Sequence, residues 1–293
     1  MRIGLLHVSR NENHAAFIDG LRDAGYVDGQ NAQIETRLYG AMLDRIAELA
    51  HELVTAQCNV IVATAPYAIR ATKSATSVIP IVAVDLESDP VASGWAASLA
   101  RPGGNLTGFF LDMPELGGKQ IALLKEATPT LSRLAILWDS TIGAVQFDAT
   151  QAAARAAGVQ VHSAPIRRST DIDDAIGSAA SAAVDGMVVL TSPLILAERV
   201  RIAEGALKAR LPTISLFTLF PRSGGLMAYG PNLPGMFKRM GILIDRLLKG
   251  AVVAEMPIER PTRFDLVVNH KTATMLGLTI PAALLVRADE VIE

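Results

Sequence analysis

The sequence predicts an α/β protein built from two doubly wound, Rossmann-like lobes, and three observations lead to this prediction. Strand-like and helix-like segments alternate along the whole 293-residue chain. Half of the residues are hydrophobic but only 5% are aromatic, which is typical of buried parallel sheets rich in Val, Ile and Leu and covered by helices. The alternation runs twice, with an interruption near Asp112–Gly118, and the length exceeds that of one typical domain.

The first half of the chain is expected to contain four strands and three helices. Cys58–Ala63 is an unbroken apolar run bounded by turn residues, as in a buried strand, whereas Phe17, Ile18 and Leu21 recur at helical spacing. The expected strands are Arg2–Val8, Ala32–Arg37, Cys58–Ala63 and Ile79–Val84. The expected helices are Glu12–Ala24, Ala41–Ala56 and Pro66–Ser74, and a loop-rich stretch follows at Asp85–Asn105.

The second half repeats the rhythm of strand and helix. Parallel strands need helical crossovers, and such crossovers are right-handed, so each half is expected to form its own sheet. The expected helices are Gly117–Ala127, Ala144–Ala157, Ile172–Ala182, Leu194–Ala209 and Pro234–Lys249. The expected strands are Leu134–Trp138, Val159–His162, Gly186–Leu190, Thr213–Leu216, Leu226–Tyr229 and Phe264–Val268.

Composition and missing motifs exclude several classes of function. The net charge is −2 and no basic stripe is present, which argues against nucleic-acid binding. The sequence contains no GxGxxG fingerprint, no P-loop lysine motif and no GxSxG elbow, and the five histidines lack metal-ligand spacing. No run reaches the roughly 18 apolar residues of a membrane span. We therefore expect no cofactor, no metal and no catalytic residues.

Polar residues follow several of the expected strands, at the sheet edge where open α/β sheets bind ligands. Each of these segments starts a helix, and main-chain N–H groups and hydroxyls at a helix N-terminus favour anions such as a ligand carboxylate. The four segments are Ser9-Arg10-Asn11-Glu12, which reads as a capping box, Thr64-Ala65-Pro66, Trp138-Asp139-Ser140 and Thr191-Ser192-Pro193.

Each candidate has a structural alternative. Ser9 and Ser192 either cap their helices or contact a ligand, and Asp89, before Pro90, either neutralises a ligand ammonium or starts a turn. Aromatic residues at strand ends either line a ligand site or pack in the core. The aromatic candidates are Tyr67, Trp138, Phe217 and Tyr229.

The order of motifs along the chain resembles an ABC-transporter family of substrate-binding proteins, whose best-described members bind aromatic amino acids such as tryptophan. The most specific segment is Leu99–Gly108, with the sequence LARPGGNLTG. Other matching segments are Gly25–Asn31, Ile79–Val82, Asp89–Val91, Gly224–Gly230, Leu247–Ala251, Asn269–Ala273, Leu276–Pro281 and Arg287–Ile292.

This resemblance implies a type I periplasmic binding fold, in which two lobes joined by three crossovers close on a ligand between them. The lobes are expected at residues 1–112 with 230–258 and at residues 113–229 with 259–293, with hinges near Asp112-Met113 and Tyr229–Pro231. It also implies a membrane permease as partner and an extracytoplasmic location. The first residues read as a strand rather than an export signal, so the alternatives are a removed signal or a cytoplasmic protein.

We therefore expect a monomeric binding protein, without enzymatic activity, for a small carboxylate such as an aromatic amino acid or an aromatic acid. The alternative within this fold is a ligand of the sugar or nucleoside class. A sensor not coupled to transport shares the same lobes. A transcription regulator would need a helix-turn-helix before the first strand, and a racemase or dehydrogenase would need a base pair or a nucleotide loop, none of which the sequence shows.

Overall fold

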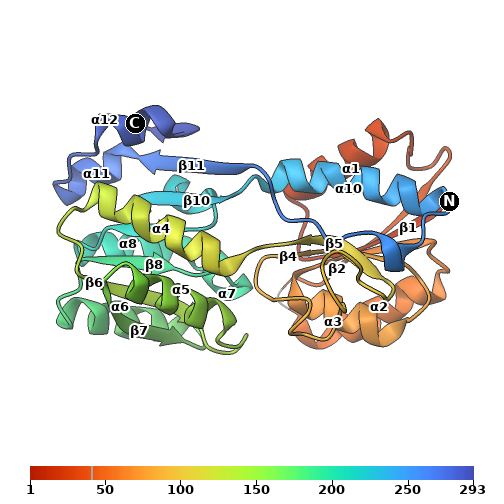
Figure 1. The fold of residues 1–293 in the computed structure, drawn as a ribbon, viewed down its shortest axis with the longest axis horizontal. Coiled ribbons are helices and arrows are strands. Elements are labelled where there is room, and N and C mark those ends of the chain that lie inside the picture. The colour runs from red at the N-terminus through yellow and green to blue at the C-terminus, as the bar shows by residue number, and fades with distance from the viewer. Residues whose placement is uncertain (41) are drawn as a thin grey trace. The chain divides into compact units, whose positions relative to one another are not determined.

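The computed structural model describes residues 1–40 and 42–293, and the chain in it divides into two compact units (Figure 1). The first unit consists of Met1–Leu111 and Asn232–Thr262, and the second of Asp112–Pro231 and Arg263–Glu293. The chain thus crosses between the units three times. The third crossing follows Thr262 rather than Ile258, because the main chain of Glu259 still pairs with Gly108 and Phe110 in the first unit.

The first unit contains a five-stranded parallel sheet with the strand order β2-β1-β3-β4-β5. Every residue of β3, β4 and β5 is buried, because helices cover both faces of the sheet. The strands are β1 (Arg2–His7), β2 (Gln33–Leu38), β3 (Val60–Thr64), β4 (Ile81–Asp85) and β5 (Leu106–Phe110).

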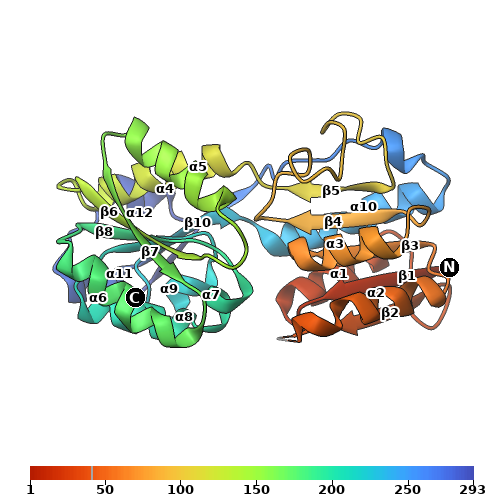
Figure 2. The ribbon, with the colours of Figure 1, turned by 90° about the horizontal axis from the view of Figure 1, so that it is seen from below.

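Two pairs of helices cover this sheet (Figure 2). α1 (Glu12–Asp23) and α10 (Leu233–Leu248) pack on one face, and α2 (Ile46–Thr55) and α3 (Ala65–Ala75) pack on the other. The helix expected over 41–56 is a short turn of helix followed by α2, and Ala41 lies outside the described residues. A second short turn of helix, Val253–Glu255, follows α10.

The strand β5 was not expected from the sequence, and the helix α4 (Met113–Ala127) begins earlier than expected. Thr107 and Gly108 interrupt the apolar pattern of β5, but the Thr107 hydroxyl is satisfied by donating to the carbonyl of Pro257 at 3.0 Å. The helix α4 begins after Asp112, whose side chain caps it, and Pro114 suits the first turn.

The helices α1 and α10 touch through two glycines. A Cβ added to Gly20 would lie 2.0 Å from the carbonyl oxygen of Lys238, and one added to Gly241 would lie 2.1 Å from the carbonyl oxygen of Gly20. Main chain therefore meets main chain at this crossing, and no side chain can move aside to make room for a methyl group.

We expect Gly241→Ala to lower the free energy of unfolding by about 1–3 kcal/mol, despite the better helix propensity of alanine. Gly177→Ala is the matched control, because Gly177 also lies inside a helix but has open space at the Cβ position. We expect the free energy of unfolding of this control to rise by up to about 1 kcal/mol. Urea unfolding of both variants checks the prediction, which is wrong if they shift the midpoint in the same direction.

The second unit contains a seven-stranded sheet with the strand order β12-β11-β10-β9-β8-β6-β7. All neighbouring pairs are parallel except β10 and β11, which are antiparallel. The strands are β6 (Arg133–Asp139), β7 (Gln160–Ile166), β8 (Gly186–Val189), β9 (Thr213–Ser215), β10 (Met227–Pro231), β11 (Phe264–Asn269) and β12 (Glu290–Ile292). Two doubly wound lobes are thus confirmed as the fold class.

Helices cover both faces of this sheet as well (Figures 1 and 2). α4, α5 (Val145–Ala156), α11 (His270–Leu276) and α12 (Ala282–Arg287) pack on one face. α6 (Ile172–Ser181), α7 (Pro193–Ala197), α8 (Arg199–Lys208) and α9 (Leu219–Arg222) pack on the other. The single helix expected over Leu194–Ala209 is wrong, because the chain leaves helical geometry at Glu198 between α7 and α8. Over the described residues, no helix is long and apolar enough to cross a membrane.

Candidate functional site

The first unit has its topological switch point between β1 and β3, because β2 lies on one side of β1 and the later strands lie on the other. His7 ends β1 and Thr64 ends β3, so their side chains meet at the carboxyl edge of the sheet. The Nδ1 atom of His7 lies 2.8 Å from the hydroxyl oxygen of Thr64. This pair marks the position where open α/β sheets bind their ligands.

His7 is a buried, neutral imidazole. Its ring packs edge-on against Phe237 of α10, with ring centroids 5.4 Å apart. Burial lowers the pKa of His7 to about 4, although the nearby Asn11 side chain opposes this shift; the nearby His14 adds to it. Its Nε2 atom has no hydrogen-bond partner among the described residues. His7 was not among the site residues expected from the sequence, although it is a polar residue directly after the buried run Ile3–Leu6.

Thr64 and Ala65 form the turn from β3 into α3, as expected. Ala65 has a φ of +70°, which is unusual for a residue with a side chain. Thr64 is the N-cap residue, but no side chain caps α3, because the Thr64 hydroxyl is engaged with His7. Tyr39 donates to the Thr64 carbonyl at 3.1 Å and holds the turn in place. No side chain therefore caps the start of α3, and the turn before it is strained in the way found at ligand sites.

Asp85 ends β4, next to β3 in the sheet, and the sequence analysis missed it. Its side chain is completely buried. The Oδ1 atom accepts from the main-chain N–H groups of Glu87 at 2.7 Å and Ser88 at 3.2 Å, whereas Oδ2 has no partner among the described residues. Burial raises the pKa of this carboxyl to about 6, and its hydrogen bonds from Glu87 and Ser88 oppose that shift. A polar residue directly after the buried run Ile81–Val84 was the signal that could have identified it.

Asp89, which was expected to neutralise an ammonium or to start a turn, starts a turn. Its Oδ1 atom accepts from the N–H groups of Val91 at 2.7 Å and Ala92 at 2.9 Å, and the residue is exposed. The side chain thus binds the main-chain N–H groups that follow it, which is how aspartate commonly begins a turn.

The capping box expected at Ser9 is wrong. Asn11 is the N-cap of α1, and its Oδ1 atom accepts from the N–H groups of Asn13 at 3.0 Å and His14 at 3.1 Å. Asparagine caps helices as well as serine does, so the helix begins two residues later than the box requires. Ser9 and Arg10 are exposed in the loop between β1 and α1.

Tyr67 lies in the first turn of α3 and is half-buried against the core below that helix. It is a neighbour of Tyr39, whose pKa is raised by burial and then by the charge of Glu87, with smaller effects of Tyr67 and Asp85. The structure therefore gathers two tyrosines and two carboxylates around the start of α3. Among the candidates from the first half of the sequence, Thr64, Ala65 and Tyr67 lie at the start of α3.

The second unit has its switch point between β6 and β8, and the expected residues at these strand ends are engaged in local contacts. The Trp138 ring stacks on Phe147 of α5, with centroids 4.7 Å apart, and its Nε1 atom donates to the Ser163 hydroxyl at 3.0 Å. Asp139 is buried, and its Oδ1 atom accepts from the N–H and hydroxyl groups of Thr141 at 2.9 and 2.6 Å. Both residues hold the carboxyl end of β6 in a fixed conformation.

The free N–H group and hydroxyl expected at Thr191 are not free, because the buried side chain of Gln146 binds both. Its Oε1 atom accepts from the Thr191 N–H at 3.2 Å and from the hydroxyl at 2.9 Å, and its Nε2 atom donates to the Thr191 carbonyl at 3.0 Å. Ser192 caps α7 by accepting from the N–H of Ile195 at 3.1 Å. Of the two alternatives for Ser192, the structure thus shows capping.

Phe217 and Tyr229 are the remaining aromatic candidates, and both are half-buried. Phe217 follows β9, and Tyr229 lies in β10 beside it. The Tyr229 ring stacks on Phe264 of β11, with centroids 5.5 Å apart, and its carbonyl accepts from Gln120 at 3.0 Å. Phe217 lies beyond the carboxyl end of β9 and Tyr229 in the middle of β10, and each leaves part of its side chain exposed.

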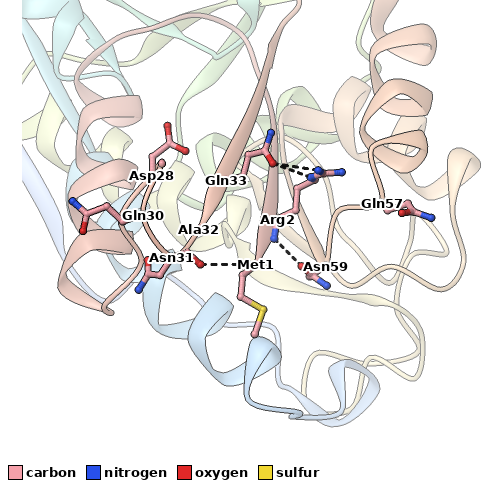
Figure 3. Close-up of a pocket in the computed structure, with 10 residues that line it drawn as sticks. Met1, Arg2, Asp28, Gln30, Asn31, Ala32, Gln33, Gln57 and Asn59 are labelled. Atoms are coloured by element: carbon pink, nitrogen blue, oxygen red, sulfur yellow. Dashed lines mark hydrogen bonds between the residues drawn. The ribbon is translucent and has the colours of Figure 1, made fainter.

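A polar pocket of about 800 Å³ lies at the opposite edge of the first sheet, at the amino ends of β1 and β3 (Figure 3). Arg2 in this pocket is bound by Gln33, whose Oε1 atom accepts at 3.3 and 3.2 Å, and the Arg2 N–H donates to Asn59 at 2.7 Å. Parallel α/β sheets bind ligands at their carboxyl edge, so we assign the candidate site to the edge formed by His7, Thr64 and Asp85. No group of three metal-ligating side chains occurs among the residues that the structure describes.

The chain is similar to known proteins over nearly its whole length. Residues 3–292 match the family model described as ABC transporter substrate binding protein. A tyrosine-binding protein from Clostridioides difficile (strain R20291) is 25% identical over 276 residues, which are 93% of this chain and 78% of that protein.

Solved structures share the fold. An ABC domain from Streptococcus pneumoniae in complex with L-Trp is 25% identical, with a TM-score of 0.89 over 99% of both chains. A conserved domain protein from Vibrio cholerae is 22% identical, with a TM-score of 0.91 over 99% of both chains. Both likenesses cover the two units.

Proposed function

Because the chain belongs to the ABC transporter substrate-binding protein family and has a type I periplasmic binding fold, we propose that its ligand is an aromatic amino acid. The relatives support this ligand class, since one is a tyrosine-binding protein and another is a structure with L-Trp. The family is one of solute-binding proteins, and its members act outside the cytoplasm. We propose that this chain likewise works there as a monomer without catalytic activity and delivers its ligand to a membrane permease.

The observation that carries the proposal is the uncapped N-terminus of α3 at the switch point of the first unit. Three features favour binding of a ligand carboxylate there: the strained φ of Ala65, the lack of a capping side chain, and the helix dipole. Capping side chains already occupy the corresponding N–H groups of α1 and α7. We propose that the ligand carboxylate lies at the start of α3, directly after Thr64.

The aromatic ring of the ligand needs apolar surface near the start of α3. Tyr67, in the first turn of this helix, is a half-buried aromatic residue. We propose that it contacts the ring.

Ligand-dependent melting tests the proposal. At 100 times its dissociation constant, a true ligand adds about 2.7 kcal/mol to the free energy of unfolding, which we expect to raise the melting temperature by roughly 5–10 °C. We expect this shift for L-tyrosine, L-tryptophan or L-phenylalanine. Mass spectrometry of small molecules released from the purified protein provides an independent measurement. A shift with sugars or nucleosides, and none with the amino acids, would establish the alternative ligand class.

A further inference from the structure

We propose that the carboxylate of Asp85 binds the ammonium group of the ligand, so that the site selects amino acids over aromatic acids that lack the amine. The inference rests on the proposed function and names the residue responsible for its specificity. It replaces Asp89, the residue that the sequence had offered for this role.

The contacts of Asp85 are those of a half-satisfied carboxylate. Its side chain is completely buried, and Oδ1 accepts two main-chain hydrogen bonds that fix its orientation. Oδ2 is also buried but has no hydrogen-bond partner, and Asp85 takes part in no ion pair among the described residues. A buried carboxylate oxygen without a partner costs free energy, so such an arrangement indicates a group that the protein itself does not supply.

The position of Asp85 fits the head group of an amino acid. Thr64 of β3 pairs in register with Val84 of β4, so Asp85 lies one residue beyond the strand end that begins α3. Neighbouring strands are only about 4.8 Å apart, so a ligand carboxylate at the start of α3 brings its ammonium group towards β4.

The surroundings of Asp85 favour a cation. Its charged neighbour is Glu87, and both groups act on the buried Tyr39. Burial raises the pKa of Asp85, and no positive charge is among the described groups that act on it. An ammonium group at Oδ2 supplies that charge and makes a charge-assisted hydrogen bond, which is stronger than a neutral one.

Calorimetric titrations of matched ligands test the inference. The pairs are L-phenylalanine with phenylpropionate and L-tryptophan with indolepropionate, each pair differing in the ammonium group alone. We expect wild-type protein to bind the amino acids at least about 30-fold more tightly than the acids, since loss of one partner of a buried charge pair is costly. Asp85→Asn keeps the oxygen that caps Glu87 and Ser88 but removes the charge, and we expect it to lose this preference.

Asp89→Asn is the control, because Asp89 is exposed and its capping oxygen is also retained. It should bind every ligand as wild type does. If wild-type protein binds the acids as tightly as the amino acids, or if Asp85→Asn keeps the preference, the inference is overturned while the proposed function stands. If wild-type protein binds neither group of compounds and does not bind L-tyrosine, the proposed function itself fails. The wild-type comparison decides the question even where the Asp85 variant does not fold.

Discussion

Gly108→Ala is expected to lower the free energy of unfolding of the first unit by on the order of 5 kcal/mol. Gly108 lies inside β5 with a φ of +135°, a conformation that residues with a side chain rarely adopt. A Cβ at this position would lie 2.0 Å from the carbonyl oxygen of Ala83 and 2.6 Å from its nitrogen, both in the main chain of the neighbouring strand β4. Strand β5 could relieve this collision only by giving up its pairing with β4.

The expected cost follows from two separate penalties. Backbone strain of this kind costs about 1–3 kcal/mol, and overpacking against atoms that cannot move costs at least as much again. The sum is on the order of 5 kcal/mol, a large share of the total stability of about 5–15 kcal/mol that is typical of native proteins. The N–H of Glu259 also donates to the Gly108 carbonyl, so the distortion would reach the segment before the third crossing.

Urea unfolding of Gly108→Ala beside Gly103→Ala checks the prediction. Gly103 also has a positive φ, of +75°, but the nearest atom to an added Cβ is the Ala97 methyl group at 3.7 Å. We expect the free energy of unfolding of this control to fall by only about 1–2 kcal/mol, because alanine must adopt a left-handed backbone conformation there. Equal midpoints for the two variants would show that the contact between β5 and β4 relaxes at little cost, and the argument from main-chain proximity would be wrong.

The same glycine shows which part of the fold the sequence could predict. The strands β3 and β4 are short apolar runs because helices cover both faces of the sheet, and their length and bounding turn residues identify them in the sequence. Strand β5 contains Thr107 and Gly108, which are acceptable only because of Pro257 and Ala83, residues distant in sequence. Contacts with residues so distant in sequence cannot be predicted from a local sequence pattern.

The candidate site divides in the same way. The position of Thr64 and Ala65 could be predicted, because they follow the apolar run Cys58–Ala63 and so lie at the carboxyl end of a strand. That edge is where open α/β sheets bind ligands. The occupation of Thr191 could not be predicted, because it depends on Gln146, which lies 45 residues earlier. Asp85 and Asp89 are chemically alike in sequence, and only burial distinguishes the carboxylate with an unpartnered oxygen from the one that starts a turn.

Asp85→Asn is expected to raise the free energy of unfolding of the ligand-free protein by up to about 3 kcal/mol at pH 7 and above. The pKa of Asp85 is about 6 in the folded protein, against an ordinary value of 3.8, and that difference corresponds to about 3 kcal/mol. The folded state binds more protons than the unfolded state between these values, so stability is lost as the pH rises through this window. The variant escapes this loss because asparagine is neutral.

His7 has the opposite effect on stability in nearly the same range of pH. Its pKa is about 4 in the folded protein, against an ordinary value of 6.5, so the unfolded state binds the extra proton between these values. Stability is therefore lost as the pH falls from about 6.5 to 4. In wild-type protein the two effects are expected to offset each other, which gives a flat dependence between about pH 4 and 6.

Urea unfolding at several pH values separates the two residues. The advantage of Asp85→Asn over wild type should be greatest at pH 7 and should disappear near pH 4, where Asp85 is protonated in wild type. The variant should also show the decline caused by His7 below pH 6.5, and adding His7→Gln to it should remove that decline. A difference between Asp85→Asn and wild type that does not change with pH would mean that the mutation acts on packing and that burial of charge is not its cause.

The stability change and the ligand response of Asp85→Asn, taken together, distinguish a binding residue from a structural one. A carboxylate that serves only to cap the turn at Glu87 and Ser88 would lose nothing and gain nothing in its ligand response on conversion to asparagine. A residue retained for binding is expected to lower the stability of the free protein, and replacing it raises stability while weakening the ligand. Both effects in one variant, with the gain confined to high pH, are the combined result that we expect for Asp85.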